Sequence, residues 1–265
     1  MKYQLFVSDF DGTLGCVPDI IDLETIDAIK RYTEKGGKFV ICTGRMFAAI
    51  KPICEKYGIK GLLISYQGAT IDDLNSGKRI FEGGISPDRA FEIIKLLKAE
   101  GVDVVADVDD VMYCEKETEY TDFHNKFTKV VMVENLENKI LSLNKTVLKV
   151  VATNHAEVIL PLTEKYNKYF KGEFICNNGS NRLLEIINPK CSKGESVRFL
   201  SNYFNIPLEK TLAVGDSTND IELVKGEWFG VAVGDGVEEL KKFADEVTVE
   251  FKDKPVKVLL EKYCL

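Results

Sequence analysis

Carboxylates gather in two short segments that lie far apart in the sequence. Asp9 and Asp11 stand in VSDFDGTL, while Asp216 and Asp220 stand in VGDSTND. The first segment begins within an apolar run and the second closes one, and runs of this kind predict buried strands. In open α/β sheets, ligands bind beyond the carboxyl ends of the strands. If both strands belong to one parallel sheet, these acids meet at that edge.

Several acids near one point favour a hard divalent cation. Two carboxylates roughly 4 Å apart repel by about 4 kcal/mol at an effective dielectric constant of about 20, and a cation relieves that repulsion. Mg²⁺ prefers oxygen ligands, keeps several waters and commonly shares its shell with a substrate phosphate. The sequence therefore predicts a magnesium site at these strand ends.

A hydroxyl group and a lysine occupy comparable positions. Thr43 and Gly44 follow the second predicted strand, and Lys193 begins the helix before the late strand. Lysine, threonine and the N–H groups at helix starts all donate hydrogen bonds to phosphate oxygens. Taken alone, Lys193 suits a surface position and Thr43 a helix cap. Together with the acids they indicate a phosphate site.

Other acidic patterns carry less weight. With 42 acidic residues in the chain, DxD pairs arise by chance, and Asp107-Val108-Asp109 is one of them. A calcium loop of the EF-hand type is excluded because its glycine position holds Leu14 and its final glutamate position holds Ile20. Asp9 and Asp11 therefore stand out because further acids, a threonine and a lysine are expected near them, and not because of their spacing alone.

Cysteine and histidine chemistry has little support. Seven cysteines without a CxxC pair indicate reduced, mostly buried thiols, and two histidines exclude HExxH and three-histidine zinc sites. The segment from Cys176 to Arg182 has the CxxGxxR spacing of cysteine-dependent phosphatases. That loop must lead into a helix, whereas the residues that follow here predict a strand.

The elements that must position the acids alternate between strand and helix. The first segment predicts strands at 3–10, 39–42 and 61–65, with helices from 22 to 36 and up to 58 between them. The last segment predicts helices at 194–204, just after 219 and at 237–244, and strands at 211–214 and 228–233. This alternation predicts an α/β fold: a doubly wound, Rossmann-like parallel-sheet core.

Residues 84–188 interrupt that alternation and predict an inserted α+β cap domain, leaving 1–83 and 189–265 as the core domain. The insert predicts a helix from Ser86 to Gly101, a hairpin over 102–106 and 111–114, strands at 130–133 and 147–151, and a final pair at 173–176 and 182–187. The last pair flanks an Asn178-Gly179 turn.

Charge and hydropathy argue against two classes of binding partner, nucleic acids and membranes. Thirty-five basic against 42 acidic residues give a net charge of −7, which argues against a nucleic-acid binder. The start of the chain meets an acid before a signal peptide could form, and no stretch approaches the roughly 18 apolar residues that a membrane span needs. We expect a cytoplasmic protein without a membrane partner.

In order, the motifs resemble those of the haloacid dehalogenase superfamily of phosphatases. They are VSDFDGTL at 7–14, TGR at 43–45, SKG at 192–194 and VGDSTND at 214–220. An insert between the second and third motifs is similar to the cap of Cof-like, class IIB hydrolases. Gln67 departs from the resemblance, since relatives usually have Asn there, and this affects a polar contact near the cap hinge.

The resemblance implies the role of each site residue. Asp9 would be the nucleophile that forms an aspartyl phosphate, and Asp11 would protonate the leaving oxygen and then deprotonate the attacking water. The Mg²⁺ cofactor would be held by Asp9, the backbone carbonyl of Asp11 and Asp216, with Asp220 supporting the shell. Phosphate would be bound by Thr43, Gly44, Lys193 and Asn219.

The resemblance leaves the substrate open. A small phosphorylated metabolite is expected, with sugar phosphates as the default and nucleotide, flavin-precursor and pyridoxal phosphates as alternatives. Its contacts in the insert are to be sought among Asp109, Tyr113, His124 and Asn178.

Two alternative functions remain. Phosphomutases of this class use cap arginines, and residues 84–188 contain only Arg89 and Arg182. A non-catalytic sensor of phosphorylated ligands would be expected to have lost a reactive acid, and all are present. For Arg45, a structural or surface ion pair is the preferred interpretation.

Overall fold

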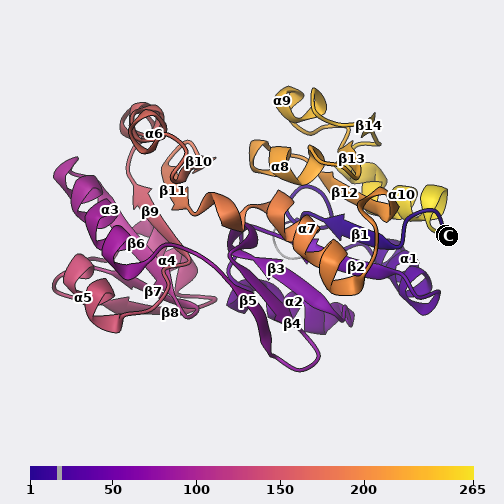
Figure 1. Ribbon diagram of the computed structural model, residues 1–265, viewed down its shortest axis with the longest axis horizontal. Helices are drawn as coiled ribbons and strands as arrows, with labels where there is room; N and C mark the ends of the chain where they lie inside the picture. Colours follow the sequence, from indigo (N-terminus) through magenta and orange to yellow (C-terminus); the bar gives the residue numbers. More distant parts are fainter. Residues whose placement is uncertain (17–19) are drawn as a thin grey trace. The chain divides into compact units, whose positions relative to one another are not determined.

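The chain divides into two compact units (Figure 1). The computed structural model describes residues 1–16 and 20–265, apart from the side chains of 179 and 180. The core unit comprises Met1–Arg45, Ile50–Ile80 and Ser192–Leu265, and the cap unit comprises Met46–Ala49 and Phe81–Cys191.

Within the described residues, an eight-stranded sheet forms the core in the order β14-β13-β12-β1-β2-β3-β4-β5. Its strands are β1 (Leu5–Ser8), β2 (Lys38–Cys42), β3 (Leu62–Ser65), β4 (Thr70–Asp73), β5 (Arg79–Glu82), β12 (Thr211–Gly215), β13 (Phe229–Ala232) and β14 (Glu246–Val247). The strands from β14 to β3 are parallel, and β4 runs antiparallel to β3. The parallel α/β core is confirmed.

The helices of the core unit follow these strands. They are α1 (Leu23–Glu34), α2 (Phe47–Tyr57), α7 (Lys193–Phe204), α8 (Ile221–Val224), α9 (Glu238–Lys241) and α10 (Pro255–Tyr263), with short 3-10 turns at Tyr66–Gly68, Leu208–Lys210, Thr218–Asp220 and Phe251–Asp253. Asp22 caps α1 by accepting the N–H groups of Glu24 and Thr25. All four residues of β1 are buried, as a continuous apolar run in a parallel sheet requires.

A mostly antiparallel sheet with the order β10-β11-β9-β6-β7-β8 organises the described part of the cap unit. Its strands are β6 (Asp103–Val108), β7 (Val111–Cys114), β8 (Lys129–Met132), β9 (Lys149–Thr153), β10 (Ile175–Ser180) and β11 (Leu183–Ile187); its helices are α3 (Pro87–Ala99), α4 (Glu119–His124), α5 (Leu136–Leu143) and α6 (Ala156–Phe170), followed by a 3-10 turn at Pro189–Cys191. One apolar core joins α3, α5 and α6 to this sheet.

One predicted turn is wrong. Strand β10 continues through Asn178 to Ser180, and the chain reverses at Asn181 and Arg182. The ladder to β11 shifts register between Asn178 and Ser180, so the glycine lies at an irregularity within a strand and not in the turn. The predictions also omit α4, α5, α6, α10, the antiparallel strand β4 and the strand β5 beside it.

Burial agrees with the expected state of the thiols. All seven cysteines are free, and all except Cys16 are buried. Burial raises the pKa of Cys42 and of Cys176, so neither thiol is a reactive thiolate at neutral pH. Across residues 1–16 and 20–265, no helix combines the length and the apolar character that crossing a membrane requires.

Candidate active site

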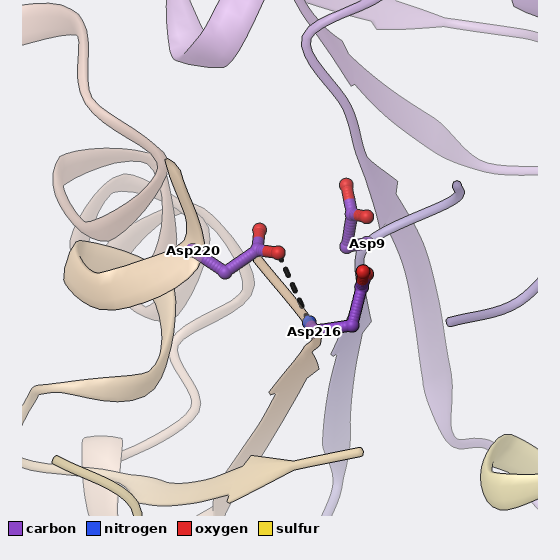
Figure 2. A group of neighbouring side chains, drawn as sticks. All are labelled: Asp9, Asp216 and Asp220. Carbon is purple, nitrogen blue, oxygen red and sulfur yellow. Dashed lines mark hydrogen bonds between the residues drawn. The ribbon is translucent and has the colours of Figure 1, made fainter. Parts of the chain in front are cut away.

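Two neighbouring strands deliver two of the predicted acids. β1 pairs in parallel with β12, and Ser8 lies opposite Val214 at the end of this ladder. Asp9 follows β1 directly, and its N–H donates to the carbonyl of Val214 at 2.9 Å. Asp216 follows β12. The sheet therefore sets both carboxylates at one edge, where Figure 2 shows them beside each other.

A fully buried lysine links these strand ends to the loop after β12. Lys193 is the first residue of α7, and only 1% of its side chain is exposed. Its Nζ donates to Oδ1 of Asp9 and to Oδ1 of Asp220, each at 2.6 Å. Charge-assisted bonds of this length fix all three side chains. Lys193 is not the surface lysine that its sequence position alone would suggest.

Asp220 holds the loop that carries Asp216. Its Oδ2 accepts the N–H groups of Asp216 and Ser217, both at 3.1 Å, and Figure 2 draws the first of these bonds. Oδ1 of Asp216 accepts the hydroxyl of Thr13 at 2.8 Å. Both oxygens of Asp220 are thus engaged, whereas Asp216 keeps an oxygen that no described residue bonds.

Burial and mutual repulsion perturb these acids. Burial, and then the charge of Asp220, raise the pKa of Asp9 well above its usual value. The same two causes raise the pKa of Asp216 to about 6. Burial alone would lower the pKa of Lys193, but the charges of Asp220 and Asp9 outweigh it and raise that pKa. Lys193 is therefore a permanent cation in this cluster.

The donor set fits a hard divalent cation. Asp9, Asp216 and Asp220 each offer an oxygen, and these three atoms lie within 4.8 Å of one another. With all three ionised, one ammonium group leaves two negative charges uncompensated. Gly12 lines the same place with φ +79°, and a Cβ there would lie 2.6 Å from Oδ2 of Asp216. Space beside the acids is thus kept by the absence of a side chain.

Asp11 lies apart from this cluster. Arg45 donates two hydrogen bonds to the carboxylate of Asp11, from Nε to Oδ2 at 2.8 Å and from Nη2 to Oδ1 at 2.6 Å. The same guanidinium lies 4.9 Å from the ring centre of Phe10. The expected ion pair of Arg45 is therefore present, and its partner is a predicted site residue. Sequence reasoning missed this link because nothing in TGR indicates where the arginine points.

The second predicted strand end supplies a tight backbone turn. Thr43 is buried, and its hydroxyl accepts the N–H of Arg45 at 3.1 Å. A Cβ on Gly44 would lie 2.3 Å from Nε2 of Gln67, so the glutamine amide lies directly against this glycine. Gln67 is buried, and its Oε1 has no hydrogen bond among the described residues. It belongs to the surroundings of the predicted phosphate site.

Asn219 has hydrogen-bonding capacity to spare. Its Oδ1 is buried and finds no partner in the described part of the chain. It lies in the 3-10 turn Thr218–Asp220, one residue before the aspartate that binds Lys193. The turn thus holds an amide group beside the charged cluster.

The cap unit contains a second buried charge cluster. Lys149 on β9 and Glu185 on β11 form an ion pair of 2.8 Å, with side chains 4% and 8% exposed. Asp107 on β6 lies opposite Lys149 in the ladder and is fully buried, and neither of its oxygens has a hydrogen bond among the described residues. Burial raises the pKa of Asp107 to about 7. The DxD pair Asp107-Val108-Asp109, which was attributed to chance, thus contains one fully buried acid with a raised pKa.

The four residues of the insert that were considered for substrate contact have different surroundings in the structure. Asp109 forms an ion pair with Lys145, Tyr113 packs against the apolar core of the cap unit, and Asn178 accepts the hydroxyl of Thr163 at 3.3 Å. His124, on α4, lines a pocket of about 460 Å³ in the cap unit. The CxxGxxR segment is followed by strand β11 and not by a helix.

Comparison with known proteins decides the family. The sequence pattern of the haloacid dehalogenase-like hydrolases matches residues 6–260. The chain belongs to this family. It is 28% identical over 265 residues to a putative phosphatase of Haemophilus influenzae, with 99% of this chain and 98% of that protein covered. Relatives of this hydrolase are named phosphatases, and the chain is an enzyme of the same type.

Two further comparisons describe relatives with known names or folds. The chain is 26% identical to the 5-amino-6-(5-phospho-D-ribitylamino)uracil phosphatase YitU of Bacillus subtilis, covering 99% of this chain and 98% of that one. A solved sugar phosphatase of subclass IIB has the same fold, with a TM-score of 0.82, 20% identity and 98% of both chains covered. The Cof-like, class IIB resemblance is confirmed.

Proposed function

We propose that this hydrolase removes phosphate from small phosphorylated metabolites through a covalent aspartyl phosphate on Asp9. The observation that carries the proposal is the meeting of Asp9, Asp216 and Lys193 at the ends of β1 and β12. Lys193 bonds Oδ1 of Asp9 at 2.6 Å, and Oδ2 has no hydrogen bond within the described ranges. We infer that this second oxygen attacks phosphorus.

Asp11 serves as the acid and base of the reaction. When Oδ2 of Asp9 bonds to phosphorus, the bond from phosphorus to the leaving oxygen breaks, and Asp11 gives that oxygen a proton. In the second half, Asp11 takes a proton from water as the water oxygen bonds to phosphorus, and the bond to Asp9 breaks. Arg45 releases or turns the Asp11 carboxylate for these transfers.

Mg²⁺ would be held by Asp9, Asp216 and the backbone carbonyl of Asp11, and it would neutralise charge on the phosphate oxygens. Asp220 supports this shell by fixing the Asp216 backbone and Lys193. Thr43, Gly44, Lys193 and Asn219 donate hydrogen bonds to the phosphoryl oxygens. Most of the catalysis is then positioning and electrostatic stabilisation, as phosphoryl transfer requires.

We assign substrate choice to residues 84–188, because the core motifs recognise only phosphate and metal. Sugar phosphates are the first candidates. The name of the Bacillus subtilis relative describes a substrate in which a phosphorylated sugar alcohol carries a uracil ring. Pentose derivatives that carry a heterocycle therefore form the second group.

Phosphate release from a panel of hexose, pentose, nucleotide, flavin-precursor and pyridoxal phosphates, with and without Mg²⁺, tests the proposal. We expect release only with the cation. Conversion of a hexose 1-phosphate into its 6-phosphate without release of inorganic phosphate would indicate a mutase instead. Binding of the same compounds without any turnover would indicate a sensor.

A further inference from the structure

A pocket of about 460 Å³ lies within the cap unit, between α4, the end of β9 and the turn after β10. Its volume falls in the range typical of small-molecule sites. Neither the family motifs nor the proposed chemistry uses it. The question is which ligand its lining would recognise.

One wall of this pocket is aromatic. Tyr120, Phe123 and His124 line it from α4. The rings of Tyr120 and His124 lie 4.1 Å apart between centroids, and the Phe123 ring meets His124 edge-on at 5.4 Å. Phe123 is 51% exposed although it is a large apolar side chain. Such a surface favours stacking of a planar ring.

Two local interactions hold parts of the aromatic wall in place. The hydroxyl of Tyr120 interacts with the buried Lys149, which forms the ion pair with Glu185. Thr118 and Thr121 close a capping box at the start of α4. A buried charge therefore holds the Tyr120 ring, and the capping box fixes the start of the helix that carries the other two rings.

His124 offers the pocket a hydrogen-bond acceptor. Its Nδ1 lies 2.8 Å from the carbonyl of Tyr120, which can only accept, so Nδ1 carries the proton. Burial lowers the pKa of His124, so the ring is neutral at pH 7. In this tautomer Nε2 is an acceptor, and within residues 1–16 and 20–265 it has no hydrogen bond.

Asn154 offers the complementary donor. Its Oδ1 accepts the N–H of His155 at 2.7 Å, which leaves the two N–H groups of Nδ2 for a ligand. The charged side chains of the lining are balanced, because Arg182 pairs with Glu119 at 3.2 Å and Asp103 with Lys116 at 2.5 Å. A pocket with balanced charge, an acceptor, a donor and an aromatic wall suits a neutral heterocycle.

We propose that the cap unit contains a binding site for a neutral nitrogen heterocycle that carries both an N–H donor and a carbonyl or ring-nitrogen acceptor. The ring stacks on the α4 wall, donates to Nε2 of His124 and accepts from Nδ2 of Asn154. It belongs either to the leaving group of the substrate, in which case the inference rests on the proposed function, or to a separate ligand.

Saturation-transfer NMR on the full chain without Mg²⁺ tests binding, with uridine, cytidine and riboflavin as probes and ribose as the non-aromatic control. We expect transfer to the rings of at least one probe and none to ribose. Phe123→Ala should weaken that binding about tenfold, because it removes a stacking face. Asn154→Ala should weaken it severalfold.

Phe127→Ala is the matched control, since Phe127 is also partly exposed, touches Phe123 at 5.4 Å between ring centroids and does not line the pocket. It should leave binding unchanged. The proposal is wrong if none of the three probe rings binds at millimolar concentration, if ribose binds as well as they do, or if Phe123→Ala has no effect.

Hydrolysis distinguishes the two sources of the ring. If it is part of the substrate, Phe123→Ala lowers kcat/KM for the phosphate ester of the bound ring and leaves hydrolysis of acetyl phosphate unchanged. If it is a separate ligand, both hydrolyses are unchanged while binding is lost. Ring binding by a chain that releases no phosphate would contradict the proposed function and not this site.

Discussion

The core unit and the cap unit each bury a lysine among carboxylates, but they balance the charge differently. Lys193 faces Asp9 and Asp220, with Asp216 beside them, so that three acids surround one ammonium group. Lys149 forms an ion pair with Glu185 and lies opposite Asp107 in the sheet, so two acids face one ammonium group. One proton on Asp107 makes the cap cluster neutral, whereas the core cluster still lacks two positive charges.

The positions of the two clusters explain this difference. The core acids follow strand ends, next to Gly12, where the missing Cβ leaves room beside Asp216. The cap acids lie within the strands β6 and β11, with neighbours on both sides in the sheet. On the proposed function, a divalent cation and a phosphate bind at the first cluster, while the second is buried within the sheet and is neutralised by protonation. The comparison therefore predicts that the buried ionic groups serve chemistry in the core unit and structure in the cap unit.

Replacing one buried aspartate in each unit by asparagine should separate the two clusters most clearly. We expect Asp9→Asn to lower phosphate release by at least about a thousandfold, because the nucleophile is lost. Asp107→Asn should keep acetyl phosphate hydrolysis within about twofold of wild type. Steady-state assays on both variants measure this, with circular dichroism to verify folding. Equal losses in the two variants would refute the distinction.

Removal of the cation should have the next largest effect. Chelation should lower activity by at least about a hundredfold, since two negative charges are left in the site, and added Mg²⁺ should restore it. Mg²⁺ should also raise the melting temperature of the wild type, because it binds only the folded state. Asp216→Asn should reduce that rise while Asp107→Asn retains it. Full turnover in metal-free buffer would contradict the assignment.

A glycine pair sharpens the claim that space beside Asp216 matters. Gly12→Ala should lower activity by about tenfold to a hundredfold, because the new Cβ would collide with Oδ2 of Asp216. Gly58 has a similar φ of +68° but nothing within 4 Å of an added Cβ. Gly58→Ala should therefore cost only about 1 kcal/mol of strain and leave activity intact. Kinetics and denaturation curves separate the two effects, and similar kinetics would reject the role of Gly12.

The smallest effect concerns stability against pH. Burial raises the pKa of Asp107 to about 7, from about 3.9 in an unfolded chain. Between these values the folded state binds one more proton, so its contribution is full below pH 4 and is lost as pH rises toward 7. From pH 5 to 7 the loss is at most about 3 kcal/mol.

Chemical denaturation of wild type and Asp107→Asn at several pH values measures this contribution. The variant should gain stability relative to wild type as pH rises from 5 to 8. The groups that face Asp107 are present in both proteins and cancel in the difference; they are Lys149, Glu185, Asp110 and Tyr120. A difference that is constant with pH would mean that Asp107 is ionised throughout.

The sequence indicated the core far better than the cap. Apolar runs that end in Asp9, Thr43 and Asp216 mark parallel strands whose carboxyl ends must share an edge, so the approach of these residues follows from order and spacing. The ion pair between Arg45 and Asp11 does not follow, because it depends on the direction of a long side chain.

The cap cluster was beyond prediction for a topological reason. Lys149 and Glu185 meet because β11 pairs with β9, and Asp107 joins them because β6 pairs with the other edge of β9. The sequence does not show which strands of such an antiparallel sheet pair with each other, because the lengths of the connecting segments do not determine the pairing. The Asn178-Gly179 pair misled the prediction of the hairpin for a local reason, because a bulge uses the same residue types as a turn.

Trapping of the phosphoenzyme shows whether Asp9 is the nucleophile. Asp11→Asn protein, in which the attack of water should be slow, is mixed with acetyl phosphate and Mg²⁺, quenched in acid and digested for mass spectrometry. The account predicts one added phosphoryl group on the peptide that contains Asp9, and none on a protein that also carries Asp9→Asn. Phosphate on another residue, or label that persists in the double variant, would contradict it.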